Sequence, residues 1–107
     1  MTEQTKSFIR VCRFDEIEEG KTKVIMFEGR EILLARQNGK VYALENICSH
    51  DGGILGEGAV VDGQVECPRH GARFDIETGQ AMRMPAVAEI ESFEVRIADG
   101  DVLVSPN

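Results

Sequence analysis

The feature that most restricts the fold of this chain is a set of three Asn-Gly or Asp-Gly pairs, each placed between two short apolar runs. The pairs are Asn38-Gly39, Asp62-Gly63 and Asp99-Gly100. A two-residue type I′ turn needs positive φ at both central residues, and these pairs adopt it readily. Because such a turn joins antiparallel neighbours, the chain is predicted to form an antiparallel all-β fold, as a sandwich or small barrel.

The segments around these turns have the composition of strands. Glu28-Gly29 adds a fourth turn signal. Helix is scarce, and residues 15–21 are expected to form a single helical turn whose acidic side chains face solvent. The predicted strands cover residues 8–14, 23–27, 31–37, 41–45, 60–61, 64–67, 93–98 and 101–104.

Charge and composition exclude several classes of partner. Twelve basic and nineteen acidic residues give a net charge of −7, which argues against nucleic acid or an anionic membrane, since both are bound through Lys and Arg. The first ten residues show no signal-peptide pattern, and no apolar run is long enough to span a bilayer. We therefore expect a cytoplasmic protein. Its three cysteines are too few, and odd in number, for a disulfide framework.

Two segments interrupt the strand pattern, and both carry a Cys and a His. Residues 46–58 contain Cys48 and His50, and the segment that begins with Cys67, at the end of the sixth predicted strand, also contains His70. The pattern is C-x-H, then sixteen residues, then C-x-x-H, and it uses both histidines of the chain. The third cysteine, Cys12, lies in the first predicted strand and is expected to be a small core residue.

Thiolates and imidazoles together are ligands for zinc, copper and iron–sulfur clusters. Structural zinc favours closely paired cysteines with a separate pair of histidines, and that spacing is not met here. A copper site with two His and one Cys would leave one thiol unused. One Cys and one His on each of two loops suits a binuclear centre, in which one iron takes the thiolates and the other the imidazoles.

At these residues the sequence resembles the Rieske-type [2Fe–2S] ferredoxins. The resemblance implies that Cys48 and Cys67 ligate one iron and that His50 and His70 ligate the other, and that Pro85 belongs to a third loop covering the cluster. It also implies a single Rieske domain over residues 1–107, with a cluster-binding subdomain at about residues 46–81 inserted in a β base. The matching motifs are Cys48-Ser49-His50, Cys67-Pro68-Arg69-His70-Gly71, Phe74-Asp75 and Thr78-Gly79.

The function that the resemblance implies is one-electron transfer, from an NAD(P)H-dependent flavoprotein reductase to a terminal oxygenase, by a monomer with no substrate site of its own. The chain is not itself a Rieske oxygenase, because no histidine remains for a mononuclear iron. Two alternatives stay open. One is a small subunit of a larger oxidoreductase, such as a nitrite reductase-like complex, and the other is an interaction module stabilised by zinc.

Departures from the high-potential members of this family predict a low potential. Those members carry an additional cysteine in each loop, where this chain has Gly53 and Arg69. They also place Ser and Tyr hydroxyl groups near the sulfurs, where this chain has Ala72 and Phe74. Fewer hydrogen bonds to sulfur destabilise the reduced cluster. We therefore expect a potential of about −150 mV rather than about +300 mV. Gly52, Gly53 and Gly71 are expected to let backbone N–H groups approach the cluster.

Overall fold

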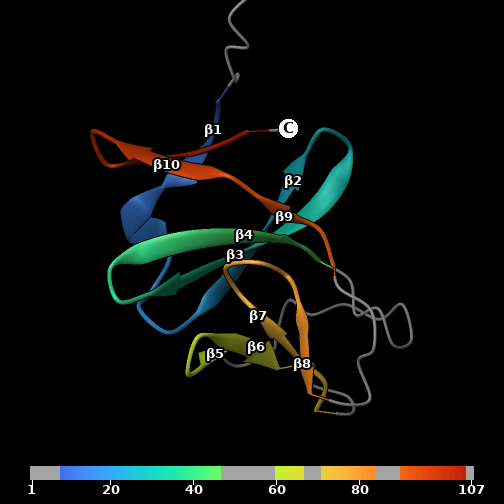
Figure 1. Cartoon of the computed structure of the whole chain (residues 1–107). Helices are drawn as coiled ribbons and strands as arrows, with labels where there is room; N and C mark the ends of the chain where they lie inside the picture. Colours follow the sequence, from blue (N-terminus) through green and yellow to red (C-terminus); the bar gives the residue numbers. More distant parts are fainter. Residues whose placement is uncertain (1–7, 47–59, 67–70, 84–89, 106–107) are drawn as a thin grey trace, which may run out of the picture.

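The computed structural model describes residues 8–46, 60–66, 71–83 and 90–105, and its strands form three antiparallel sheets (Figure 1). Sheet A has the strand order β1-β11-β10, sheet B the order β2-β3-β4-β9 and sheet C the order β5-β6-β7-β8. The all-β fold predicted from the turns is confirmed. The strands are β1 (Ile9–Arg13), β2 (Thr22–Phe27), β3 (Arg30–Gln37), β4 (Lys40–Glu45), β5 (Val60–Val61), β6 (Gln64–Glu66), β7 (Arg73–Asp75), β8 (Ala81–Arg83), β9 (Ser92–Phe93), β10 (Val95–Ala98) and β11 (Asp101–Val104).

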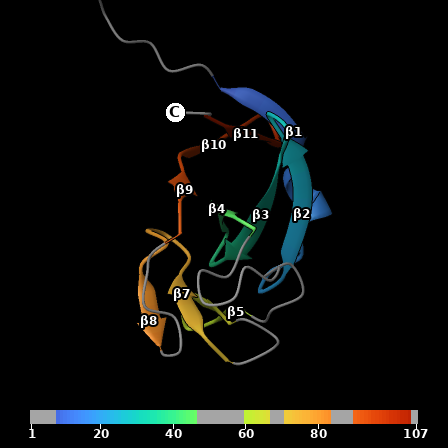
Figure 2. The same cartoon turned by 90° about the vertical axis from the view of Figure 1, so that its right-hand side faces the viewer.

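Sheet B is the middle layer, and both of its faces are covered (Figures 1 and 2). Four consecutive residues of β3, Ile32 to Ala35, have no exposed surface. Side chains alternate between the faces of a strand, so a fully buried run needs packing on both sides. Ile32 and Leu34 belong to the core shared with sheet A, whereas Leu33 and Ala35 belong to the core shared with sheet C.

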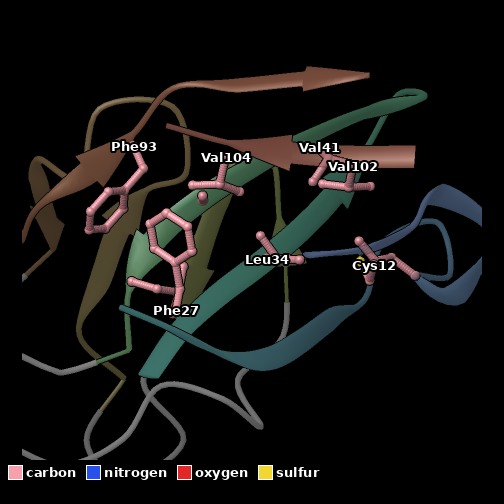
Figure 3. Packing of buried hydrophobic residues seen from close by; sticks show 10 residues of the cluster. Cys12, Phe27, Leu34, Val41, Phe93, Val102 and Val104 are labelled. Atoms are coloured by element: carbon pink, nitrogen blue, oxygen red, sulfur yellow. The ribbon is translucent and has the colours of Figure 1, made fainter. Parts of the chain in front are cut away.

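Figure 3 shows the core between sheets A and B, which among the described residues has more buried members than the core between sheets B and C. Phe27 and Phe93 meet there edge to face, with ring centroids 6.3 Å apart, an arrangement that aromatic quadrupoles favour. Cys12 is buried in this core, as expected from its place in the first predicted strand. The other buried members are Ile17, Ile32, Leu34, Val41, Ala43, Val102 and Val104.

The core between sheets B and C consists of small and large apolar side chains from both sheets, which contact one another. Phe74 of β7 is its largest fully buried side chain. Val60, Tyr42 and Ala81 cover its margins. The buried members are Leu33, Ala35, Leu44, Val65, Ala72, Phe74, Ile76 and Ile90.

The predicted turns are present with the expected backbone. Asn38, Asp62 and Asp99 have φ between 50° and 57°, and the glycine after each also has positive φ. Glu28-Gly29 adopts the same turn, although Glu enters the left-handed region less readily than Asn or Asp. Glu19 closes the Asn38-Gly39 turn, because its carboxylate accepts hydrogen bonds from both backbone N–H groups.

Three expectations differ from the structure. The run predicted as one strand over residues 93–98 is divided at Glu94, since β9 pairs with β4 and β10 pairs with β11. The helical turn expected at residues 15–21 is a 3₁₀ turn over Phe14–Glu16. Strands β7 and β8 were not predicted, because each has only three residues and Thr78-Gly79 reads as loop.

No helix among the described residues is long and apolar enough to cross a membrane.

Candidate metal centre

The predicted ligands Cys48, His50, Cys67 and His70 lie outside the described residues, as do Gly52, Gly53, Arg69 and Pro85. Within residues 8–46, 60–66, 71–83 and 90–105, no group of three His, Cys, Asp or Glu side chains could hold a metal ion. The described residues form the frame from which the ligand-bearing segments leave, and the site is built from that frame.

Both ligand-bearing segments begin at one core. Leu44, Val65 and Ala72 all belong to the cluster between sheets B and C. Along the chain, Leu44 precedes Cys48 by four residues, Val65 precedes Cys67 by two, and Ala72 follows His70 by two. The packing of sheet C on sheet B therefore determines where both segments start and where the second one ends.

The turns lie at the opposite end of the strands from these segments. Residues of the β3–β4, β5–β6 and β7–β8 turns line one polar hollow of about 510 Å³, which includes Asn38, Asp62 and Glu77. Strands β4 and β6 run away from their turns, so residues 47 and 67 follow the far strand ends. The strand ends at Glu45 and Glu66, which precede the ligand-bearing segments in the sequence, thus lie away from the hollow.

The start of the first segment is anchored by Asn46. This buried side chain, only 7% exposed, donates through Nδ2 to Glu31 Oε1 at 3.0 Å, and its backbone N–H donates to Glu31 O at 3.2 Å. Beside it, the Glu45 N–H donates to Glu91 O at 2.8 Å. Buried polar groups are stable only when paired. These bonds determine the direction in which the chain leaves β4.

The second segment is closed at its base by a pair of opposite charges. Glu66 ends β6, Arg73 begins β7, and their Cα atoms are direct partners in the antiparallel register. Arg73 Nη2 lies 3.8 Å from Glu66 Oε1, and the side chains are 26% and 31% exposed. Gly71, inside this closure, has φ +77°. Arg73 Nε is buried and has no hydrogen-bond acceptor among the described residues.

Asp75 and Gly79 determine the path of the chain after β7. Asp75 Oδ1 accepts from the backbone N–H groups of Glu77 at 2.8 Å and Thr78 at 3.1 Å. An ideal Cβ on Gly79 would lie 2.0 Å from Ile90 O, and the Ile90 N–H donates to Gly79 O at 2.8 Å. Only glycine permits this approach. Asp75 thus closes its own turn, and Gly79 connects this turn to the segment before β9.

The described residues fit an iron–sulfur cluster in two respects. Arg73 supplies a buried N–H and a positive charge at the base of the second segment, and cluster sulfurs accept hydrogen bonds and carry negative charge. Ala72 and Phe74 are completely buried and bring no hydroxyl group. Neither side chain can donate a hydroxyl hydrogen bond to a cluster sulfur, which agrees with the argument for a low reduction potential. The low potential itself stays a prediction.

The sequence interpretation missed the pairing of Glu66 with Arg73 that closes this frame. Glu66 stands directly before Cys67, and Arg73 stands three residues after His70, so their proximity to the ligands was a visible signal. Their pairing depends on the register of β6 and β7, which the sequence pattern did not reveal. Cys12 lies in the core between sheets A and B, and not in the core from which the ligand-bearing segments start. Burial raises the pKa of its thiol, which favours the neutral form.

Comparisons with known proteins agree with this arrangement. The model of the Rieske [2Fe-2S] domain family matches residues 7–94. The ferredoxin component of the naphthalene 1,2-dioxygenase/salicylate 5-hydroxylase systems of Ralstonia sp is 32% identical over 100 residues, which cover 94% of this chain and 96% of that protein.

Solved structures show the same likeness. The ferredoxin of carbazole 1,9a-dioxygenase from Nocardioides aromaticivorans IC177 superposes with a TM-score of 0.89 at 30% identity, over 94% of this chain and 99% of that one. A chain in the complex of reduced oxygenase and oxidized ferredoxin in carbazole 1,9a-dioxygenase superposes with a TM-score of 0.86 at 27% identity, over 94% of each chain.

Proposed function

Because this chain belongs to the Rieske [2Fe-2S] domain family, we propose that it carries single electrons from a flavoprotein reductase to a terminal oxygenase. Its similarity to ferredoxin components over nearly the full length of both chains supports this role. A bound [2Fe–2S] cluster supplies a site that accepts and returns one electron. The observation that carries the proposal is the set of two Cys and two His on two segments that leave one common core.

The proposed ligands are Cys48 and Cys67 for one iron and His50 and His70 for the other. The frame supports this assignment through its strand ends. Asn46 is held by Glu31 two residues before Cys48, and Glu66 is paired across the sheet with Arg73 directly before Cys67. Rigid strands that end next to ligands hold a site more accurately than loops alone.

The partners belong to the same proposal. One of the similar structures is a complex of reduced oxygenase and oxidized ferredoxin, and this supports a terminal oxygenase as the acceptor. We further propose an NAD(P)H-dependent flavoprotein reductase as the donor, a monomeric carrier in the cytoplasm, and no reaction on an organic substrate by this chain itself. The net charge of −7 suits partners that present basic docking surfaces.

Electron paramagnetic resonance of the anaerobically purified protein tests the ligands. We expect a silent oxidised state and, after dithionite reduction, an S = 1/2 signal whose mean g lies below that of a four-Cys cluster. Cys48→Ala and Cys67→Ala should abolish this signal. Cys12→Ala is the matched control, because Cys12 is buried in the other core, and it should keep the signal. A colourless protein containing zinc without sulfide would contradict the proposal.

A second experiment separates a mobile carrier from a fixed subunit. The reduced protein is mixed with the terminal oxygenase of a dioxygenase system, and the absorbance of the cluster is followed in a stopped-flow instrument. If the protein is a mobile carrier, the oxygenase should reoxidise its cluster, and the protein should elute alone in size-exclusion chromatography. Stable co-elution with a large oxidoreductase, without transfer to an oxygenase, would favour the small-subunit alternative.

A further inference from the structure

We infer that the charges of Glu66 and Arg73 act on the reduction potential of the centre held by this chain in opposite directions and balance each other, in addition to closing the β6–β7 ladder. The inference rests on the proposed function, because it requires a cluster bound by Cys67 and His70. The two residues are direct cross-strand partners, and their charged atoms lie 3.8 Å apart.

The location of the pair gives it access to the centre. Glu66 is bonded to Cys67, and Arg73 follows His70 by three residues. Consecutive Cα atoms are about 3.8 Å apart, and directly opposed strand residues are about 5 Å apart. The backbone of the pair therefore lies within about 9 Å of the Cα of Cys67. In addition, Glu66 Oε2 lies 3.4 Å from the position that a Cβ on Gly71 would take, and Gly71 directly follows His70.

On the mean exposure of its two side chains, the pair is better shielded from water than the other described ion pairs, although Arg36 alone, at 24%, is less exposed than Arg73. Its side chains are 26% and 31% exposed, whereas Arg30 and Glu91 are 42% and 43% exposed, and Arg10 and Asp101 are 54% and 30% exposed. Charges with less water around them act more strongly on their neighbours. The Glu66–Arg73 pair is therefore the one whose imbalance a nearby redox centre would sense most.

Glu66 and Arg73 interact through their opposite charges and do not form a hydrogen bond with each other. The distance of 3.8 Å exceeds hydrogen-bonding range, and Arg73 Nε keeps an unused N–H among the described residues. Reduction adds one electron, supplied by the reductase or by an electrode, and no bond forms or breaks. An unbalanced Arg73 would stabilise the added negative charge, and an unbalanced Glu66 would oppose it.

The test is the midpoint potential of the cluster-loaded protein, measured by voltammetry. Glu66→Gln leaves Arg73 unbalanced and should raise the potential. Arg73→Gln leaves Glu66 unbalanced and should lower it, each with a several-fold change in the one-electron equilibrium constant. The double variant should return near the original value. Arg10→Gln, which breaks a pair on sheet A, is the control and should leave the potential unchanged.

Shifts of the same sign in both single variants, or no shift in either, would overturn the inference and leave the pair a purely structural contact. If neither neutral variant holds a cluster, Arg73→Lys decides, because lysine keeps the charge without the planar fork. An unchanged potential in Arg73→Lys supports the inference, and a changed potential or a lost cluster overturns it. If the unaltered protein gave no electron paramagnetic resonance signal after dithionite reduction, that result would instead refute the proposed function.

Discussion

The two base sheets, A and B, and sheet C are held together by different kinds of interaction. The base sheets contain strands of up to eight residues and share a core with ten buried members among the described residues. Sheet C has strands of two or three residues. Its turn is closed by the Asp75 carboxylate and by the approach of Gly79 to Ile90.

This difference shows how the chain separates folding from function. Long strands with alternating side chains form a stable sheet from pattern alone. Short strands have too few ladder bonds for that, and they depend on specific contacts such as that between Gly79 and Ile90. The strand ends that precede the ligand-bearing segments belong to both regions, since β4 is part of the base and β6 is part of sheet C. The start of each segment therefore depends on the packing of sheet C on the base.

The largest effect is expected for Gly79→Ala. The new Cβ would meet Ile90 O at 2.0 Å, at a residue whose φ is +80°, so the turn must move away from the segment before β9. We expect a loss of about 5 kcal/mol in the free energy of unfolding, since steric overlap and backbone strain act together. Urea unfolding measures the loss, and visible absorbance measures the cluster content.

Gly29→Ala is the matched control for this change. Gly29 also has φ +80°, but no atom lies within 4 Å of the position of its Cβ. The cost should be only that of the left-handed backbone, about 1 to 2 kcal/mol. Equal losses in the two variants would show that the contact with Ile90 does not matter.

A pair of phenylalanine substitutions compares the two cores. Phe74→Ala and Phe27→Ala each remove a buried ring, one between sheets B and C and the other between sheets A and B. Each should cost about 3 to 5 kcal/mol. Cluster content per folded molecule, from iron analysis, should fall more in Phe74→Ala, and an equal fall would remove the distinction between the two regions.

The Asp75 turn should contribute less. Asp75→Ala leaves the N–H groups of Glu77 and Thr78 without their acceptor, and we expect a loss of about 1 kcal/mol, because both groups can turn to water. Asp75→Asn keeps an acceptor oxygen and should retain most of the stability. Thermal unfolding of both variants checks this, and an equally large loss in Asp75→Asn would show that charge, not hydrogen bonding, holds the turn.

The smallest effect is a pH dependence in the base. Hydrogen bonds from the N–H groups of Asn38 and Gly39 lower the pKa of the Glu19 carboxyl. A lowered folded-state pKa adds stability above the unfolded value of about 4.3, and this stability is lost as the pH falls through the folded value. The difference in unfolding free energy between the original protein and Glu19→Gln should therefore shrink below pH 4.

Glu18→Gln is the control for this titration, because Glu18 is an exposed neighbour whose side chain makes no bond to the turn within the described part of the chain. Unfolding curves are compared at several pH values from neutral to acid. A constant difference between the original protein and Glu19→Gln across this range would contradict the assignment.

Much of the base could be predicted from the sequence. The type I′ turns at Asn38, Asp62 and Asp99 were predictable because few residue pairs adopt positive φ twice in succession. The strands around them follow from apolar runs of the right length. Strand β11 agrees residue for residue with the prediction over Asp101–Val104, because both its alternation and its turn are local signals.

The contacts of sheet C could not be predicted in the same way. Strands β7 and β8 are too short to show a period. In the base, the division at Glu94 was equally unpredictable, because it reflects a change of pairing partner from β4 to β11. The proposed ligands themselves were identifiable, because two thiols and two imidazoles in this spacing are a chemical signal that does not depend on the fold.

The sequence by itself determined the turn positions, the all-β class and the donor set, because backbone preference and ligand chemistry are properties of single residues and short spacings. Only the tertiary structure decided that Ile32 and Leu33 face different cores, that Glu66 stands opposite Arg73, and that Gly79 meets Ile90. Each of these depends on strand register and sheet packing, which bring together residues whose contact no local pattern records.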